Sequence, residues 1–327
     1  MRVPLILIDT AYTFERVMET SGPLAALFAE LRRMFSYPFM QNALLAGTIV
    51  ALVAGVAGYF MVLRGESFAG HSLANIGFAG AAGAALLGVP VVVGLISFGL
   101  LGALGIGALA ERASHARSRN DVAVGAVLVL GLGLGVLFER LSSAKASSVY
   151  AILFGAPLGV ASADVREIAL TAGVTLLALA VIARPLLFAS VDPSVAESRG
   201  APVRLLAYGF LILLALAVAQ ATQVVGVLLI FALLVAPAAA AQRLTACPGR
   251  GVALAVGIAL AITWASLIAA YFSAYPVGFF ITSLALGVYL SGRLIQLVAG
   301  RASMTQRQKL GGMTQVAVGA QSQEARG

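Results

Sequence analysis

Apolar runs of about 20 residues, separated by short polar segments, follow one another along the chain from Ala43 onward. A helix rises roughly 1.5 Å per residue, so each run is long enough to cross about 30 Å of hydrocarbon. The pattern predicts nine membrane-spanning helices, at 43–63, 70–88, 91–109, 122–138, 168–183, 205–221, 224–241, 252–272 and 277–297. A further apolar patch at 150–159 is short and contains Pro157, and the sequence leaves open whether it enters the membrane without crossing.

The composition agrees with a membrane location. Hydrophobic residues make up 61% of the 327 residues, the mean hydropathy is +1.00 and only 10% of the residues are charged. Soluble domains average about 25% charged residues, so a soluble globular fold is excluded. We therefore expect an all-α polytopic membrane protein. The single cysteine, Cys247, excludes an internal disulfide and a metal site built from several thiolates.

The basic residues predict the orientation of the spans. The loops between nine spans, together with the two ends, divide the 21 Lys and Arg residues into sets of 14 and 7. The larger set includes Arg64, the segment 184–204 and the C-terminus, and the positive-inside rule predicts that it is cytoplasmic. The basic residues form no cluster with interleaved aromatic residues, so nucleic acid is not expected as a partner.

Two segments flank the predicted transmembrane domain, which covers 43–298. The first 42 residues carry balanced charges and two prolines, and they are predicted to form a surface segment. This segment is either an amphipathic helix over 24–35 that lies along the membrane interface or a flexible extension. Residues 299–327 are predicted to form a disordered cytoplasmic tail.

The stretch 64–80, read as R-G-E-S-F-A-G-H-S-L-A-N-I-G-F-A-G, runs from a charged loop into an apolar segment. His71 and Asn75 are four residues apart and therefore lie on one face of a helix. Polar groups near a lipid-embedded helix cost free energy unless they face a cavity or a partner, which makes this pair a candidate functional site. Spacing alone equally allows the pair to form hydrogen bonds with a neighbouring helix.

Motifs of the common catalytic classes are missing from the sequence. A phosphate-binding loop of the G-x-x-x-x-G-K-[ST] type needs a lysine after glycine, and the two lysines, Lys145 and Lys309, stand in A-K-A and Q-K-L. The chain is therefore not expected to hydrolyse ATP. The two histidines, His71 and His115, lie on different elements and belong to no H-E-x-x-H motif. The chain therefore lacks the zinc ligands of a metalloprotease. We expect no enzymatic activity.

The predicted cytoplasmic segment 184–204 contains a second candidate site, read as R-P-L-L-F-A-S-V-D-P-S-V-A-E-S-R-G-A-P-V-R. Asp192 can cap a helix that has Pro193 at its first position, while Gly200 and Pro202 end it. A short helix at about 192–201 is therefore predicted between two spans. A solvated loop helix without a task has the same pattern.

Five separated runs resemble the membrane permease subunit of zinc/manganese ABC importers, in the same order and spacing over about 36–297. They are Y-P-F-M-Q-N-A-L-L-A-G (37–47), F-M-V-L-R-G-E-S-F-A-G-H-S-L-A-N-I-G-F-A-G (60–80), Y-A-I-L-F-G (150–155), V-D-P-S-V-A-E-S-R-G (191–200) and Q-V-V-G-V-L-L-I-F-A-L-L-V-A-P-A-A-A-A (223–241). The resemblance implies a type II ABC importer fold with eight or nine helices, as a homodimer in the lipid of the bacterial cytoplasmic (inner) membrane. It also implies two cytoplasmic ABC ATPase subunits that bind the ATP, and an extracytoplasmic metal-binding protein.

The resemblance also assigns roles to residues of this chain. The metal path falls on His71 and Asn75, at the dimer interface, and the residues that couple to the ATPase are Asp192, Pro193, Ala196 and Gly200. Asn75 departs from the family, which typically has histidine at this position, and an amide oxygen is a poorer transition-metal ligand than imidazole. The implied cargo is a divalent metal ion, with zinc favoured over manganese or iron, and no prosthetic group is expected.

A secondary transporter or channel that works without ATP is the alternative. Such proteins usually carry acidic residues inside the membrane, and the predicted spans contain almost none. A membrane-embedded enzyme would need paired titratable groups, which the spans also lack. Glu66 has two interpretations: it attracts cations to the cytoplasmic mouth of a path, or it is a solvated loop acid.

Overall fold

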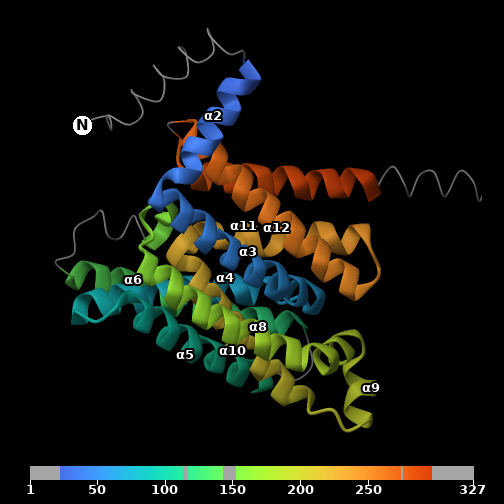
Figure 1. Ribbon diagram of the computed structural model, residues 1–327. Coiled ribbons are helices and arrows are strands. Elements are labelled where there is room, and N and C mark those ends of the chain that lie inside the picture. The colour runs from blue at the N-terminus through green and yellow to red at the C-terminus, as the bar shows by residue number, and fades with distance from the viewer. Residues whose placement is uncertain (1–22, 113–116, 143–151, 274, 297–327) are drawn as a thin grey trace, which may run out of the picture.

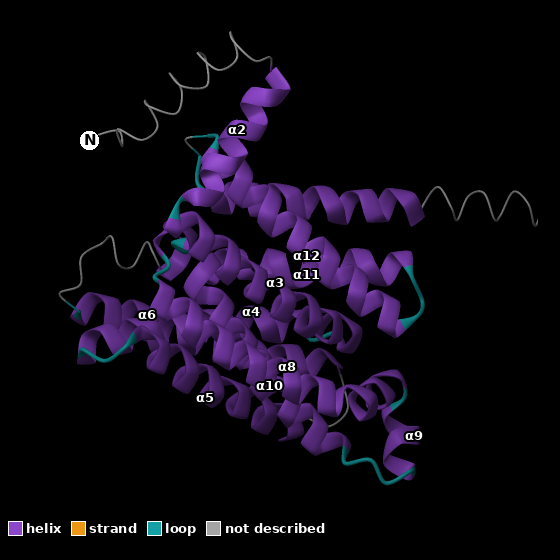
Figure 2. Cartoon of the chain, viewed as in Figure 1, coloured by secondary structure: helices purple, strands orange, loops and turns teal. Residues whose placement is uncertain are grey.

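The computed structural model describes residues 23–112, 117–142, 152–273 and 275–296, and in these ranges the chain consists of helices and loops without strands (Figure 2). The helices in chain order are α2 (Pro23–Ser36), α3 (Pro38–Arg64), α4 (Ser67–Leu87), α5 (Val91–Arg112), α6 (Arg117–Leu141), the 3-10 turn η1 (Pro157–Gly159), α8 (Ser162–Val191), α9 (Pro193–Ser198), α10 (Val203–Val225), α11 (Val227–Leu244), α12 (Pro248–Tyr271) and a last helix Val277–Gln296.

Eight helices in the described part of the chain are long and apolar enough to cross a membrane. They are α3, residues 91–110 of α5, residues 121–141 of α6, α8, α10, α11, α12 and Val277–Gln296. The predicted all-α polytopic membrane fold is thus confirmed, and eight of the nine predicted spans correspond to these helices.

The ninth predicted span is α4, which forms the centre of the bundle. It packs along α5 and α6 and also contacts α10 and α11 (Figure 1). Nearly every residue from Ala69 to Ala84 is buried, so the helix has no single apolar face. A helix that is apolar all round is typical of a core position. The polar residues of the first candidate site therefore lie on a helix that is enclosed along most of its length.

Small residues allow α4 and α5 to approach closely, as the glycine content of these helices predicts. A Cβ atom at Gly80 would collide with the carbonyl oxygen of Gly94, and one at Gly94 would collide with that of Gly80. Close backbone contact supplies the van der Waals packing that holds helices together in lipid. These two glycines fix how near α4 lies to α5.

The helix α8 is longer than predicted. The sequence suggested a span at 168–183 followed by a loop from Arg184, but α8 continues through Pro185 to Val191. Proline costs a helix one hydrogen bond. The residues that follow it, Leu186 and Ala189, are buried in the core and hold the helix in place despite this loss. The loop before α9 therefore begins only at Asp192.

Contacts between distant parts of the chain define the two ends of the bundle. At one end, the amide nitrogen of Gln242 donates to the carbonyl oxygen of Tyr59 at 2.9 Å, which joins the ends of α11 and α3. This end also carries α9 and the turn at Cys247, whose side chain is exposed (Figure 1). At the other end, the amide nitrogen of Asn42 donates to the carbonyl oxygen of Val160 at 3.3 Å. We call these the α9 end and the α2 end.

The apolar patch predicted at 150–159 is described from residue 152 onward and lies at the α2 end. It contains η1, and the backbone of Gly155 packs against the Gly226 turn that connects α10 to α11. Gly226 has φ 89° and ψ 158°, a conformation that needs glycine. The described part of this patch, from residue 152 onward, therefore packs against the Gly226 turn and contains no helix long enough to cross the membrane.

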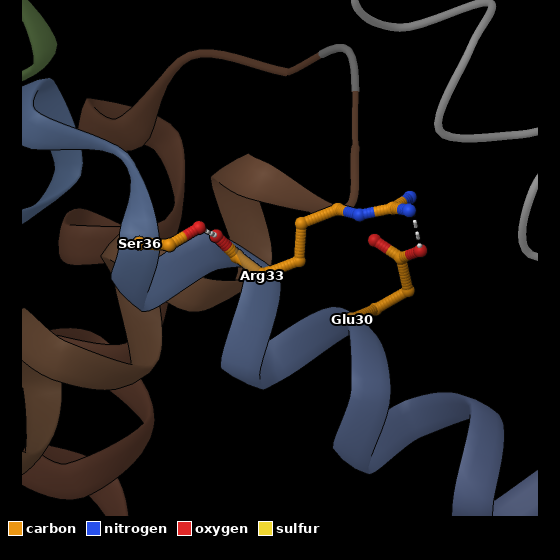
Figure 3. A network of polar contacts seen from close by, with 3 residues as sticks. All are labelled: Glu30, Arg33 and Ser36. Carbon is orange, nitrogen blue, oxygen red and sulfur yellow. Dashed lines mark hydrogen bonds and ion pairs between the residues drawn. The ribbon is translucent and has the colours of Figure 1, made fainter.

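The helix α2 packs on the same end through its last two turns. Met34 is fully buried. Glu30 is also buried, and its Oε1 forms an ion pair with Nη1 of Arg33 at 3.2 Å (Figure 3). The hydroxyl of Ser36 donates to the carbonyl oxygen of Arg33 at 2.6 Å and ends the helix. Whether α2 lies along a membrane interface stays a prediction. Residues 1–22 and the predicted tail at 299–327 lie outside the described residues.

Candidate functional site

His71 and Asn75 lie one turn apart near the start of α4, as their spacing predicts. Asn75 is only 5% exposed, while His71 is half-buried. The next residue, Ser72, points to the other side, where its hydroxyl donates to the carbonyl oxygen of Val124 in α6 at 3.1 Å. Ser72 and His71 therefore point in different directions from α4.

The amide of Asn75 holds the histidine ring. Its nitrogen Nδ2 donates to the carbonyl oxygen of His71 at 2.9 Å and lies 3.3 Å from Nε2 of the imidazole. With the amide as donor, Nε2 is the acceptor and the ring proton is on Nδ1. Nδ1 is buried and has no hydrogen-bond partner in the described residues. In this tautomer, the lone pair of the imidazole ring is engaged by Asn75.

An aromatic residue from another helix completes the surroundings of His71. The ring of Phe231 in α11 lies 5.2 Å from the imidazole, centroid to centroid, with an angle of 66° between the planes. This edge-to-face contact covers one side of the ring. Sequence reasoning missed Phe231, because a contact between two helices leaves no trace in the local spacing of either one.

The donor set at this site is small. Among the described residues, no group of three or more His, Cys, Asp or Glu side chains could hold a metal ion. One chain therefore offers the imidazole of His71 and the amide oxygen of Asn75, whereas transition metals in proteins generally take four or more ligands. A site of this kind binds a metal ion only weakly unless water or another chain supplies further ligands.

The helix α9 has the cap that the sequence predicts. Asp192 precedes it, Pro193 is its first residue, and the carboxylate oxygen Oδ1 accepts from the backbone nitrogens of Ser194 and Val195, both at 3.1 Å. The hydroxyl of Ser194 also donates to Oδ1, at 2.6 Å. These hydrogen bonds, with the Ser194 hydroxyl first, lower the pKa of the Asp192 carboxyl below its usual value. The cap is therefore ionised and fully formed at neutral pH.

The helix is short but anchored. Ala196 is fully buried, while the residues on the opposite face are exposed. Gly200 ends the segment with φ 81°, in the left-handed region, and α10 begins three residues later. Thus α9 projects at its end of the bundle between α8 and α10 (Figure 1). The predicted residues Asp192, Pro193, Ala196 and Gly200 form one compact unit.

A cavity of about 590 Å³ separates α9 from the start of α4. Pro193, Ser194 and Glu197 of α9 form one wall, and the turn between α3 and α4 forms another. Side chains from α5, α6 and α10 also line it. The two candidate regions, α9 and the start of α4, therefore share a cavity, although neither His71 nor Asn75 lines it.

The turn between α3 and α4 contains an ion pair that lines this cavity. Two guanidinium nitrogens of Arg64, Nε and Nη2, lie 2.9 and 2.8 Å from Oε1 of Glu66. The side chain of Glu66 is 25% exposed, and burial raises the pKa of its carboxyl while Arg64 opposes that rise. Glu66 is thus a partly buried, ion-paired acid of the turn rather than a fully solvated one, and its attraction of cations stays a prediction. The sequence R-G-E at 64–66, with opposite charges on either side of a glycine, could have predicted this ion pair.

Comparison with known proteins extends this description. Residues 36–296 match the sequence profile of the ABC 3 transport family, ABC-3. Residues 1–35, which contain most of α2, lie outside the match.

Two bacterial proteins illustrate the similarity. A manganese transport system membrane protein of Listeria innocua is 34% identical over 215 residues, which cover 66% of this chain and 75% of the relative. A chelated iron transport system membrane protein of Yersinia pestis is 34% identical over 211 residues, which cover 64% of this chain and 70% of the relative.

A solved structure has a similar fold. The structure described as PsaBC from Streptococcus pneumoniae in complex with Fab superposes with a TM-score of 0.73 at 28% sequence identity. The superposition covers 81% of this chain and 95% of the matched chain. The arrangement of helices described above is therefore shared with the matched chain of that structure.

Proposed function

This chain belongs to the ABC 3 transport family, the membrane permease subunits of metal ABC importers, and from this premise we propose that it carries manganese or ferrous iron past His71 and Asn75. It is a transport subunit and not an enzyme, since ATP hydrolysis belongs to a separate subunit in this class. The observation that carries the proposal is the pair itself, a histidine and an amide on the central helix of a membrane bundle.

The choice of metal rests on the relatives and on ligand chemistry. The sequence alone favoured zinc, but the relatives named above are described as manganese and chelated iron transport proteins. Amide and water oxygens suit manganese, while imidazole suits iron as well as zinc. An imidazole with an amide oxygen is consistent with manganese or iron, and we propose these two metals in place of zinc.

The small donor set supports a homodimer. Two ligands from one chain are too few to select a metal ion, and a second copy related by a two-fold axis would double them. We propose that His71 faces this axis, so that two imidazoles and two amides line a single path. Weak coordination suits transport, because the ion must also leave the site.

Partners and orientation follow from the same proposal. Two ABC ATPase subunits would bind at the α9 end, with Asp192, Pro193, Ala196 and Gly200 forming the coupling segment, and a metal-binding protein would deliver cargo at the α2 end. The positive-inside prediction puts the α9 end and the C-terminus in the cytoplasm. The host membrane would then be the bacterial cytoplasmic membrane.

Transport assays with one variant and a neighbouring control test this function. The full chain, its ATPase and its binding protein would be reconstituted in lipid vesicles, and uptake of Mn²⁺, Fe²⁺ and Zn²⁺ measured with and without ATP. We expect ATP-dependent uptake of Mn²⁺ or Fe²⁺. His71→Ala should abolish it, because one of the two ligands of each chain is lost, while the complex still assembles.

Ser72→Ala is the matched control, since Ser72 is on the same turn but bonds to α6. It should retain uptake. Uptake that His71→Ala leaves unchanged would refute the role of His71, and uptake independent of ATP would favour a secondary transporter.

A further inference from the structure

The ion pair between Arg64 and Glu66 joins three helices at the α9 end. Arg64 is the last residue of α3, and Glu66 directly precedes α4. The guanidinium carbon of Arg64 also lies 5.3 Å from the ring centroid of Phe210 in α10, a cation–π distance. The pair therefore has contacts with α3, α4 and α10 at once.

The connection from this pair to His71 is short and stiff. Gly65 adopts φ 71°, and the backbone nitrogen of Glu66 donates to the carbonyl oxygen of Met61 at 2.9 Å. The carbonyl oxygen of Glu66 in turn accepts from the nitrogen of Gly70 at 3.2 Å, in the first turn of α4. A displacement of Glu66 must therefore displace the turn that is followed at once by His71.

The other side of the pair faces α9 across the cavity. Arg64 and Glu66 form one wall and Ser194 and Glu197 of α9 another, so movement of α9 changes the space next to the pair. Movement of α9 also reaches the pair through α10, which begins just after α9 and carries Phe210.

The Glu66 carboxylate depends on Arg64. Its oxygen Oε2 is buried without a hydrogen-bond partner, and Oε1 is held by the guanidinium. A partly buried carboxylate that lost this cationic partner would be left uncompensated, which is unfavourable. The two side chains are therefore expected to move together when the turn moves.

We propose that Arg64 and Glu66 are positioning residues for transport, which transmit a displacement of α9 to the first turn of α4 and thus to His71. This inference rests on the proposed function. It makes the ion pair the connection between the end of the bundle that would bind the ATPase and the metal path at His71. A pair that only stabilised the turn would affect assembly and ATP hydrolysis to the same degree as uptake. A positioning pair affects the ratio of metal transported to ATP hydrolysed.

The test measures both quantities in the same reconstituted complex, with radiolabelled Mn²⁺ as the probe. We expect Glu66→Gln and Arg64→Gln each to lower the number of Mn²⁺ ions taken up per ATP by about tenfold, within the range of typical coupling effects, while hydrolysis continues. The double variant Arg64→Glu with Glu66→Arg can restore the ion pair but not the cation–π contact with Phe210, so it should recover part of the ratio.

Two controls separate this effect from a general loss of charge. Asp121→Asn removes another acid that lines the same cavity, and Glu30→Gln removes the ion pair at the α2 end. Both should leave the ratio near that of the wild type.

Two results would overturn the inference: an unchanged ratio in both single variants, or a parallel fall of uptake and hydrolysis that the charge exchange does not reverse. A wild-type complex that takes up no metal would instead refute the proposed function itself, so the two failures are distinguishable.

Discussion

Asn75 engages Nε2 of His71 through its amide nitrogen, and a metal ion that binds Nε2 must displace this contact. A lone pair cannot serve a hydrogen bond and a metal at once. If the amide turns over, its oxygen becomes available as a second ligand beside the imidazole. In the proposed metal path, the amide would therefore compete with the metal in one orientation and assist it in the other, which would keep binding weak and reversible.

Asp192 allows a test of α9 at the scale of one side chain. Its oxygen caps the helix through the nitrogens of Ser194 and Val195, and Asn can accept the same bonds. Asp192→Ala should loosen α9 and reduce metal-stimulated ATP hydrolysis severalfold, while Asp192→Asn retains most of it. The measurement is the ATPase rate of the reconstituted complex.

The sign of the pH effect on this cap follows from the lowered pKa. The contribution of the ionised Asp192 is present above the usual aspartate pKa and is lost as the pH falls through the lower value in the folded protein. At neutral pH, an assay of the wild type against Asp192→Ala therefore compares a fully formed cap with a missing one. Equal ATPase rates for the alanine and asparagine variants would show that capping of α9 does not matter.

The residues that sequence reasoning found and missed differ in one physical respect. His71 with Asn75, and Asp192 with its helix, interact within a few residues of each other, so periodicity and capping rules predicted their contacts. Phe231 meets His71 from α11, and Arg64 meets Phe210 from α10. Contacts of this second kind depend on how helices pack, which no local pattern encodes.

At the scale of elements, length and apolarity predicted where helices lie better than where they end. The segment after Arg184 was interpreted as a loop, yet burial of Leu186 and Ala189 carries α8 past Pro185 to Val191. Tertiary packing outweighed one missing hydrogen bond. The central place of α4 was also not predictable, since its sequence resembles those of the surrounding spans.

The contact between α4 and α5 predicts a difference between two glycine substitutions. Gly80→Ala should destabilise the protein by about 1–3 kcal/mol, because its Cβ would collide with the Gly94 carbonyl oxygen and with Cβ of Phe98. Gly133→Ala on α6 is the control, since an added Cβ there meets no atom within 4 Å. The measurement is thermal unfolding of the detergent-solubilised protein. Equal melting temperatures for the two variants would contradict close packing at Gly80.

At the scale of the whole molecule, the orientation in the membrane sets which partner meets which end. The charge distribution predicts that the α9 end is cytoplasmic, and Cys247 is exposed at that end. A membrane-impermeant maleimide should therefore label Cys247 in inverted membrane vesicles and leave it unlabelled in intact spheroplasts. Labelling of intact spheroplasts would reverse the orientation and place α9 outside.

The single exposed thiol has a further consequence for spectroscopy. Because the chain contains one cysteine, a spin label attached to Cys247 marks a single place on each subunit without any engineered substitution. In the proposed homodimer, the two labels would report one distance across the symmetry axis. Pulsed electron resonance could then follow that distance through the ATP cycle and time the opening of the α9 end on the native sequence.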